Sequence, residues 1–201
     1  LHFTGPGTDL KVGLADDHEW MGGASQAQNG VICNPNIPSE EVFTTPHYLR
    51  VEGHVSSTKP LSHQGSLIDE IRVEFKEGAI VDAKASKGEK IFRKVLESDD
   101  GARRLGEVAL VPDSSPISQS GLLFYNTLFD ENAACHIALG QCYSKCFKSK
   151  QNLSQEEIKS RGGNSSMIHI DWMIGSKEID IDGLSENGEI TPVFRKGEWC
   201  V

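Results

Sequence analysis

The sequence contains no run of about 18 consecutive apolar residues, the length that a membrane-spanning helix needs. Its N-terminus also has no charged segment followed by an apolar one, as a secretory signal would have. Basic residues are few, since 20 Lys and Arg stand against 29 Asp and Glu. We therefore expect a soluble protein without a membrane or nucleic-acid partner, because neutralising phosphates requires a basic face. The acidic excess suits divalent cations or a substrate with a positive amine, and equally serves solubility.

Close pairs of cysteines are missing too, apart from Cys142 and Cys146, which lie four positions apart. The five cysteines are an odd number in a chain long enough to fold without disulfides, so we expect reduced thiols and a cytoplasmic protein. A structural zinc site is not expected without a second close pair. The Gly-x-Ser-x-Gly motif of serine hydrolases is also absent. A hydrolase with Ser118 or Cys135 as nucleophile and His136 as base remains an alternative, although neighbours such as Cys135 and His136 point apart on a helix.

The 201 residues are enough for one well-filled core, and no internal repeat divides them. Leu1 leads almost directly into a strand-like segment, so we expect the chain to be part of a longer one. Apolar patterning predicts more strands than helices and hence a mixed α+β domain. The expected strands cover residues 9–14, 48–58, 71–75, 79–85, 105–111, 167–175, 179–184 and 190–194. The expected helices cover residues 88–97 and 131–147, with a surface helix and a loop within 148–164.

Two of the apolar strands contain charged or polar residues. Glu107 lies inside the run Leu-Gly-Glu-Val-Ala-Leu-Val, where an ionised carboxylate is costly to bury unless it binds a metal or pairs with a cation. An ion pair with Arg103 or Arg104 is an alternative explanation. In the motif Ile-His-Ile-Asp-Trp, alternate side chains share one face of the expected strand, so His169 and Asp171 project together. Such a pair provides two metal ligands, a ligand with its orienting partner, or a hydrogen-bonded core histidine.

The longest expected helix carries further candidates. His136 and Tyr143 lie seven positions apart, almost two helical turns, and would face the same way, as would an ordinary packing stripe. Glu131 is at the expected start of the helix, where the helix dipole favours a carboxylate whatever its role. Glu41 ends an acidic pair after residues 34–38, a proline-containing stretch that we expect to be extended. Together these segments offer the oxygen and nitrogen donors that divalent metals take in co-catalytic sites.

Eight segments, spread in order over nearly the whole chain, match the sequence pattern of a known family. They are GTDL at residues 7–10, NPNIPSEEVFTTP at 34–46, STKPL at 57–61, GARRLGEVALVP at 101–112, SPIS at 115–118, FYNTLFDENA at 124–133, CHIALG at 135–140 and HIDWMIGS at 169–176. Through these segments the chain resembles the metalloaminopeptidases of the aminopeptidase T and aminopeptidase S type.

The resemblance implies two divalent metal ions, for which zinc, cobalt and manganese are all suitable. It implies a ligand set of six residues, which in this sequence are Glu41, Glu107, His136, Tyr143, His169 and Asp171. The implied reaction is hydrolysis of the N-terminal peptide bond of peptides by a water that the two metals activate. We expect Glu131 to act as the general acid and base, and Tyr143 to act as a ligand or as a donor to the oxyanion.

Members of that family are longer, with an additional N-terminal α/β domain. We therefore expect residues 1–201 to form the C-terminal metal-binding catalytic domain. Family members also form dimers whose domains enclose the active sites, which implies a homodimer here. The alternative function is that of a non-catalytic metal-binding or assembly domain that lacks a complete substrate pocket.

Overall fold

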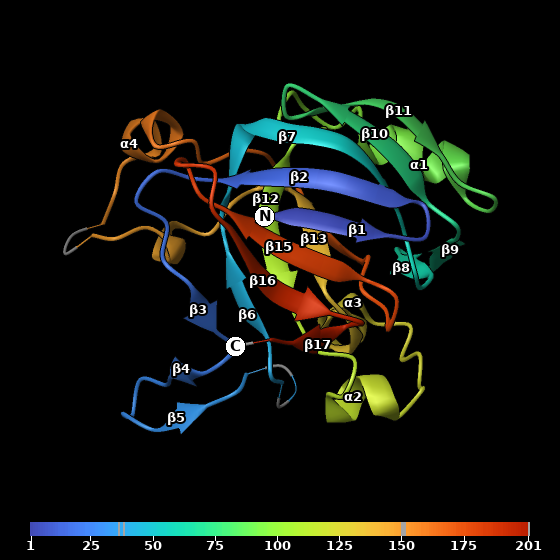
Figure 1. Cartoon of the computed structure of the whole chain (residues 1–201), viewed down its shortest axis with the longest axis horizontal. Helices are drawn as coiled ribbons and strands as arrows, with labels where there is room; N and C mark the ends of the chain where they lie inside the picture. Colours follow the sequence, from blue (N-terminus) through green and yellow to red (C-terminus); the bar gives the residue numbers. More distant parts are fainter. Residues whose placement is uncertain (36, 38, 150–151, 201) are drawn as a thin grey trace.

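The computed structural model describes residues 1–35, 37, 39–149 and 152–200, and its largest element is an eight-stranded antiparallel sheet (Figure 1). Near the middle of this sheet, a strand from the beginning of the sequence lies beside one from near its end, since β1 pairs with β15. From one edge to the other the sheet consists of β11 (Ala79–Lys84), β10 (Arg72–Lys76), β7 (Pro46–Ser56), β2 (Thr8–Leu14), β1 (His2–Gly5), β15 (Asp180–Leu184), β16 (Ile190–Arg195) and β17 (Glu198–Trp199).

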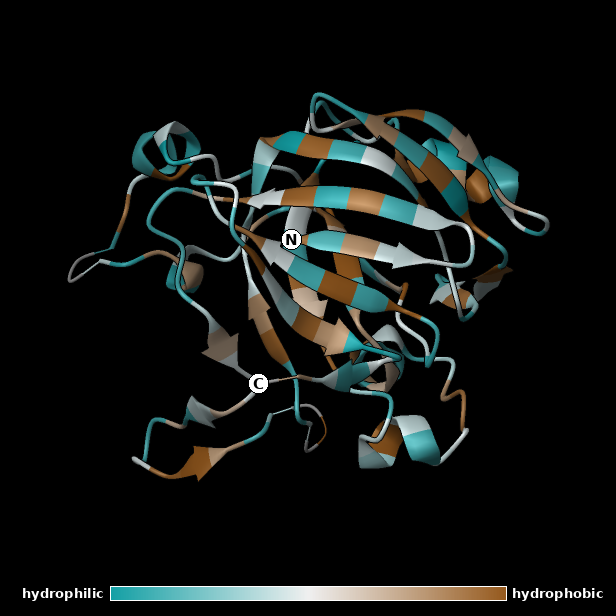
Figure 2. Cartoon of the chain, viewed as in Figure 1, coloured by the Kyte–Doolittle hydropathy of each residue, from teal (hydrophilic) through white to brown (hydrophobic). Residues whose placement is uncertain are grey.

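Alternation along these strands determines which face of the sheet is buried. In β2, Thr8, Leu10 and Val12 are buried while Asp9 and Lys11 are exposed. Figure 2 shows the same change between hydrophobic and hydrophilic residues along β2, β7 and β10. Because successive side chains of a strand point to opposite faces, one face of this sheet packs on the core and the other meets solvent. The strands expected over residues 71–75 and 79–85 are observed as the hairpin β10–β11, and those expected over 179–184 and 190–194 as the hairpin β15–β16.

A second, five-stranded antiparallel sheet lies behind the first in the view of Figure 1. Every residue of its two central strands, β12 and β13, is buried. Strands that are buried on both faces read as apolar runs, which is why the sequence predicted β12 correctly. In order, the sheet consists of β14 (His169–Met173), β13 (His136–Gly140), β12 (Leu105–Leu110), β6 (Val42–Thr44) and β3 (Met21–Gly22).

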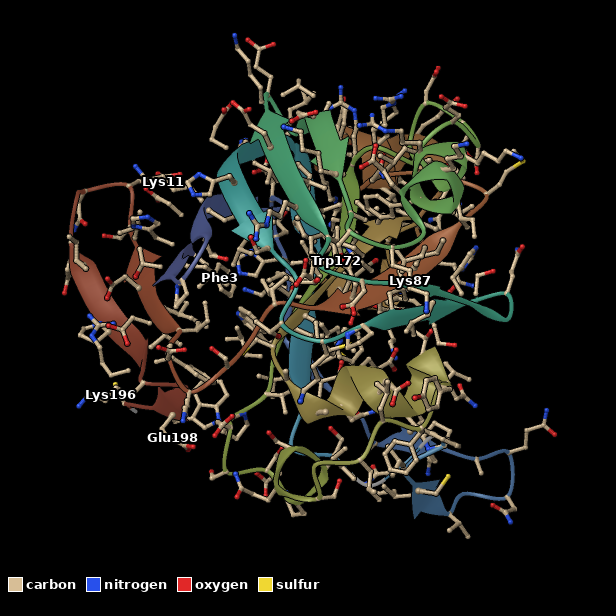
Figure 3. All side chains as sticks on the ribbon, turned by 90° about the vertical axis from the view of Figure 1, so that its right-hand side faces the viewer. Phe3, Lys11, Lys87, Trp172, Lys196 and Glu198 are labelled. Atoms are coloured by element: carbon tan, nitrogen blue, oxygen red, sulfur yellow. The ribbon has the colours of Figure 1, made fainter. Side chains whose placement is uncertain are left out.

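The main hydrophobic core fills the space between the two sheets. Phe3 of β1 and Leu10 of β2 contribute from the first sheet, and Ile137 of β13 and Trp172 of β14 contribute from the second. Figure 3 shows Phe3 and Trp172 in the interior of the molecule. The ring of Phe92 packs edge-on against Trp172, with centroids 6.4 Å apart. The architecture is therefore a sandwich of antiparallel sheets, with the helices at its margins.

The expected helix over residues 131–147 is wrong. This segment forms a 3₁₀ turn η1 (Glu131–Ala133), then strand β13, then a second 3₁₀ turn η2 (Ser144–Cys146). Its apolar run is short, and periodicity cannot separate a short buried strand from a buried helix. Pairing with β12 on one side and β14 on the other satisfies the backbone groups of β13, which decides the outcome. His136 and Tyr143 consequently do not share a helix face.

Short elements complete the described structure, and the mixed α+β class is confirmed. The helix expected over 88–97 is observed as α1, and the surface helix expected within 148–164 as α4, which begins with a capping box. Residues 36, 38, 150 and 151, which belong to the stretches expected to be extended or looped, lie outside the described residues. None of the described helices has the length and apolar character to cross a membrane. The short elements are α1 (Glu89–Val95), α2 (Pro116–Gln119), α3 (Thr127–Asp130), α4 (Gln155–Ser160), β4 (Ser25–Gln26), β5 (Ile32–Cys33), β8 (Leu61–His63) and β9 (Ser66–Ile68).

Candidate metal centre

A cluster of acidic and imidazole side chains lies on the face of the five-stranded sheet that is turned away from the main core. On β14, Ile170 and Trp172 join the core, so the alternate residues His169 and Asp171 project from the other face. The expectation that these two project together is confirmed, because His169 Nε2 lies 3.4 Å from Asp171 Oδ1.

Glu107 of β12 reaches the same cluster from two strands away. It is opposite Ala138 of β13, which in turn is opposite Asp171 of β14. Because all three positions share a face, the small side chain of Ala138 leaves space between the two carboxylates. Glu107 Oε2 lies 3.3 Å from His169 Nε2, and Glu107 Oε1 lies 3.9 Å from His136 Nε2. One carboxylate thus faces two imidazoles.

The alternative pairing of Glu107 with an arginine is not found among the described contacts. Arg104 instead donates to the carbonyl oxygens of Tyr48 and Glu77, at 2.8 and 3.0 Å. Arg103 is exposed. The partners of the buried Glu107 carboxylate are therefore histidines, as in metal sites and hydrogen-bonded clusters.

Glu41 completes the cluster from the other side of β12, and His136 completes it from β13, between β12 and β14. Glu41 directly precedes β6, and its Oε1 lies 3.2 Å from His136 Nε2. Both imidazoles are oriented in the same manner, because the Nδ1 of His136 contacts the Ala134 carbonyl at 3.0 Å and the Nδ1 of His169 contacts the Gln141 carbonyl at 2.7 Å. A carbonyl only accepts, so each Nδ1 donates and each Nε2 is presented to the carboxylates.

The donor atoms form two groups, each compact enough to surround one metal ion. The first consists of Glu41, Glu107 and His136, and the second of Glu107, His169 and Asp171, with the donors of each group within 4.8 Å of one another. Glu107 belongs to both. Five of the six residues that the sequence nominated as ligands are therefore brought together, from β12, β13, β14 and the residue before β6.

The side chains of this cluster have shifted pKa values, and the direction of the shift differs from one group to another. Burial raises the pKa of Glu107. Burial alone would lower the pKa of the imidazoles, but hydrogen bonds to Glu41 for His136, and to Asp171 and Glu107 for His169, raise them to about 10 and about 11. For Asp171 burial acts upwards, yet the hydrogen bond from His169 leaves its pKa lowered. The buried carboxylates therefore stabilise positive charge next to them, and the imidazoles supply that charge because their raised pKa values keep them protonated.

Tyr143, the sixth nominated ligand, follows β13 at the edge of the cluster. Its ring centroid lies 4.7 Å from that of His169, and the side chain is 41% exposed. Burial and the nearby carboxylates, Glu107 first, raise the pKa of its hydroxyl, so the hydroxyl keeps its proton. A protonated phenol at this position can donate a hydrogen bond to a developing negative charge.

Glu131, at the junction of α3 and η1, is a buried carboxyl that belongs to neither donor group. Burial, and then the charge of Asp171, raise its pKa to about 8. A carboxyl with a pKa near neutrality can both accept and return a proton. The expected position of Glu131 at the start of a long helix is wrong, because Glu131 caps the C-terminal end of α3 and begins a 3₁₀ turn, and its burial was not foreseen.

A cavity of about 320 Å³ opens onto the cluster and is large enough for a small peptide end. Lys145 of η2 and His63 of the β8–β9 hairpin also line the cavity. Nothing in the sequence distinguished these two residues, because only the tertiary fold brings η2 and the hairpin next to the cluster. The lining residues are Gly23, Ser25, Pro35, Glu41, Phe43, His63, Glu107, Thr127, Leu128, Glu131, Tyr143, Lys145, His169, Ile170 and Asp171.

The alternative of a serine or cysteine nucleophile has no support in the geometry. Among the described residues that line the cavity, neither Ser118 nor Cys135 is present. Cys135 is buried, its Sγ donates to the Val111 carbonyl at 3.3 Å, and burial raises its pKa to about 12. A thiol in this state is a poor nucleophile.

The two donor groups share a buried carboxylate and lie at the bottom of a cavity beside a sandwich of antiparallel sheets. This arrangement has the chemistry of a divalent-metal enzyme domain. The sequence comparison is consistent with that class. The chain belongs to the thermophilic metalloprotease (M29) family, whose sequence model matches residues 1–199.

The curated relatives are identical to this chain at about half of the aligned positions. The chain is 54% identical over 201 residues to aminopeptidase T of Thermus aquaticus and 52% identical over 200 residues to aminopeptidase 2 of Geobacillus stearothermophilus. These alignments cover 100% of this chain but 49% and 48% of the relatives, so the chain spans about half the length of the curated relatives that it matches.

Solved structures agree with this relationship. The wild-type AmpT of Thermus thermophilus superposes with a TM-score of 0.92 at 54% identity, over 100% of this chain and 49% of that one. A 2,5-dihydroxypyridine dioxygenase from Pseudomonas putida KT2440 shares the fold alone, with a TM-score of 0.59 at 13% identity, over 98% of this chain and 54% of that one. The sandwich itself therefore does not determine the reaction.

Proposed function

We propose that this chain is the metal-binding catalytic domain of an aminopeptidase that uses two divalent metal ions. The observation that carries the proposal is the position of Glu107, whose two oxygens face one donor group each. A carboxylate shared in this way is how two ions are held a few ångströms apart in two-metal hydrolases. The aminopeptidase names of the relatives support the reaction class.

The residues present fit such a pair of ions. Glu41, Glu107, Glu131 and Asp171 are largely or fully removed from solvent. Among the described residues, the ion-pair partners of Glu41, Glu107 and Asp171 are histidines and not Lys or Arg. Burying several carboxylates is costly without compensating cations, and imidazole and carboxylate are the ligands that zinc, cobalt and manganese accept.

In this proposal Glu41, Glu107 and His136 hold one ion, Glu107, His169 and Asp171 hold the other, and Tyr143 acts as a further ligand or as the oxyanion donor. The ions would supply an acidified water and a polarised carbonyl. Glu131 accepts the proton of the attacking water and returns it to the leaving amine. The hydroxyl of Tyr143 donates to the oxygen of the tetrahedral intermediate. The free α-amine of a peptide would be anchored at one of the two ion sites, which would confine cleavage to the N-terminal residue.

Elemental analysis combined with a peptidase assay tests the proposal. The purified protein is expected to contain up to two transition-metal ions per chain and to release the N-terminal residue from peptides. Glu107→Gln and Asp171→Asn are expected to remove at least one ion and to abolish hydrolysis, because each deletes a charged ligand. Metal content that is unchanged in both variants would contradict the proposed centre.

The alternative function predicts a different outcome of the same experiment. A non-catalytic metal-binding or assembly domain would bind the ions through the same residues but cleave no peptide, even in the full-length protein. The two functions are therefore separated by turnover and not by metal content.

Further details of the proposal concern the molecule as a whole. We infer zinc, cobalt or manganese as the metal, peptides with a free N-terminus as substrates, a homodimer and a cytoplasmic location. Residues 1–201 would form the C-terminal catalytic domain next to a separate α/β domain. Size-exclusion chromatography with light scattering of the metal-loaded protein checks the dimer directly.

A further inference from the structure

Lys145 of η2 is the one Lys or Arg among the described residues that line the cavity. Its Nζ lies 4.8 Å from the ring centroid of Phe43 and 5.4 Å from that of Tyr143. Contacts with aromatic faces hold an ammonium in place without neutralising it. The carboxylates of the cavity are engaged by imidazoles, and none of the described ones forms an ion pair with Lys145.

The ammonium is separated from the cluster by one aromatic ring. Tyr143 contacts Lys145 through its ring and also lies 4.7 Å from the ring of His169, which belongs to the second donor group. One residue of extended peptide spans about 3.3–3.6 Å. A substrate whose scissile bond lies at the cluster can therefore place its next residue within reach of Lys145.

Charge balance indicates what Lys145 recognises there. With two divalent ions on the cluster, the charges of Glu41, Glu107 and Asp171 would be fully compensated, and Lys145 is the Lys or Arg side chain of the described cavity lining that keeps its charge unpaired. A positive group that is fixed but unpaired attracts an anion.

We propose that Lys145 binds a carboxylate carried by the residue that follows the scissile bond. That carboxylate is the C-terminus of a dipeptide or the side chain of an Asp or Glu at the second position. This inference rests on the proposed function, because it assigns a substrate preference to the same site. It makes Lys145 a specificity-determining residue and not a part of the proton-transfer machinery.

Pairs of substrates that differ only in the carboxylate test the preference in the full-length, metal-loaded protein. The value of kcat/KM is expected to be about three- to tenfold higher for Leu-Gly than for Leu-Gly-amide, the size of a partly exposed ion pair. Leu-Asp-amide against Leu-Asn-amide reports on the side-chain source in the same way. Lys145→Met is expected to remove the preference mainly through KM, whereas Lys145→Arg retains it.

Lys148→Met is the matched control, because Lys148 follows closely in the chain, is exposed and does not line the cavity. This variant is expected to keep the preference of the wild type. Equal preferences in the wild type and in Lys145→Met, for both substrate pairs, would overturn the proposal.

Binding of an uncleavable probe separates this inference from the proposed function. The probe is the Leu-Gly analogue with CH₂ in place of the scissile carbonyl, compared by calorimetry with its C-terminal amide. Tighter binding of the carboxylate form that is lost in Lys145→Met supports the inference even if the protein cleaves nothing, in which case only the proposed function fails. Equal affinities of the two forms for the wild type would overturn the role of Lys145.

Discussion

The environment of Glu131 differs strongly from that of an ordinary surface carboxylate. Glu131 is 8% exposed, lines the cavity and stands outside both donor groups. Burial raises its pKa to about 8. These properties suit a group that moves a proton, because the carboxyl is close to the cluster but belongs to neither donor group.

Glu131→Gln is expected to reduce kcat by about 10²–10⁴-fold with little change in KM, since general acid–base catalysis contributes roughly that factor. The metal content is expected to stay the same, because the amide keeps the shape of the side chain and the donor groups are complete without it. Steady-state kinetics and elemental analysis of the same preparation measure both effects. Glu97→Gln, which changes an exposed carboxylate, is the control, and a loss of bound metal in Glu131→Gln would contradict the assigned role.

At the same scale, the sequence identified the cluster better than its surroundings. His169 and Asp171 could be paired from strand alternation alone, and Glu107 was conspicuous as a charge within an apolar run. Lys145 and His63 had no such signal, because a polar residue in a turn or at the end of a short hairpin strand is unremarkable until that segment is known to border a cavity.

Among the elements, the turn before β12 depends on one carboxylate. Asp99 accepts hydrogen bonds from the backbone N–H of Met167 at 2.6 Å and of Gly101 at 2.9 Å, and from the hydroxyl of Ser166 at 2.8 Å. It thereby connects the turn after α1 to the segment that leads into β14, which carries two of the proposed ligands. The hydrogen bond from Met167, the largest contribution, lowers the pKa of Asp99 below its usual value.

Asp99→Asn is expected to lower the free energy of unfolding at pH 7 by about 1 kcal/mol, a small value because the carboxylate is partly exposed. A lowered folded-state pKa stabilises the native state at pH values above the unfolded-state pKa of about 3.9, and this contribution is lost as the pH falls through the folded-state pKa. The difference between variant and wild type is therefore expected to be constant from pH 7 to pH 5 and to shrink below about pH 4. Urea unfolding across this range measures it, with Asp100→Asn as the control, and a difference that grows in acid would contradict the assignment.

The misassigned element shows where sequence patterns stop being informative. The hairpins, β12 and β14 followed from alternation or from apolar runs with clear ends. Strand β13 did not, because it is apolar on both faces, only five residues long and flanked by two 3₁₀ turns. Its neighbours β12 and β14 are distant in the chain, so only the tertiary fold makes a strand the better choice.

For the molecule as a whole, the proposed centre connects strands that are otherwise joined by hydrogen bonds. Its donors come from β12, β13, β14 and the residue before β6, which together make up most of the second sheet. Ions bound there would stabilise the native state alone, since the unfolded chain does not present these donors together.

Chelation is therefore expected to lower the melting temperature by about 5–10 °C, which corresponds to about 2.7 kcal/mol of binding free energy at a hundredfold excess over Kd. Adding zinc, cobalt or manganese back is expected to restore it. Differential scanning calorimetry with and without EDTA measures the change. The melting temperature of Glu107→Gln is expected to change less when EDTA is added. A wild-type melting temperature that changes with neither chelator nor metal would contradict a structural contribution of the ions.

The pairing of β1 with β15 also affects how the protein folds during its synthesis. In that ladder His2 faces Asp182, so the first sheet closes only when β1 meets β15, which is distant from it in the sequence. Contacts between residues so distant in sequence form late, because the entropy of loop closure must be lost before they contribute. During synthesis at about 5–20 residues per second, β1 lacks this partner until β15 has left the ribosome. One of its edges lacks a partner during that delay, so crowded polysomes and slow translation are the conditions under which neighbouring nascent chains would pair wrongly.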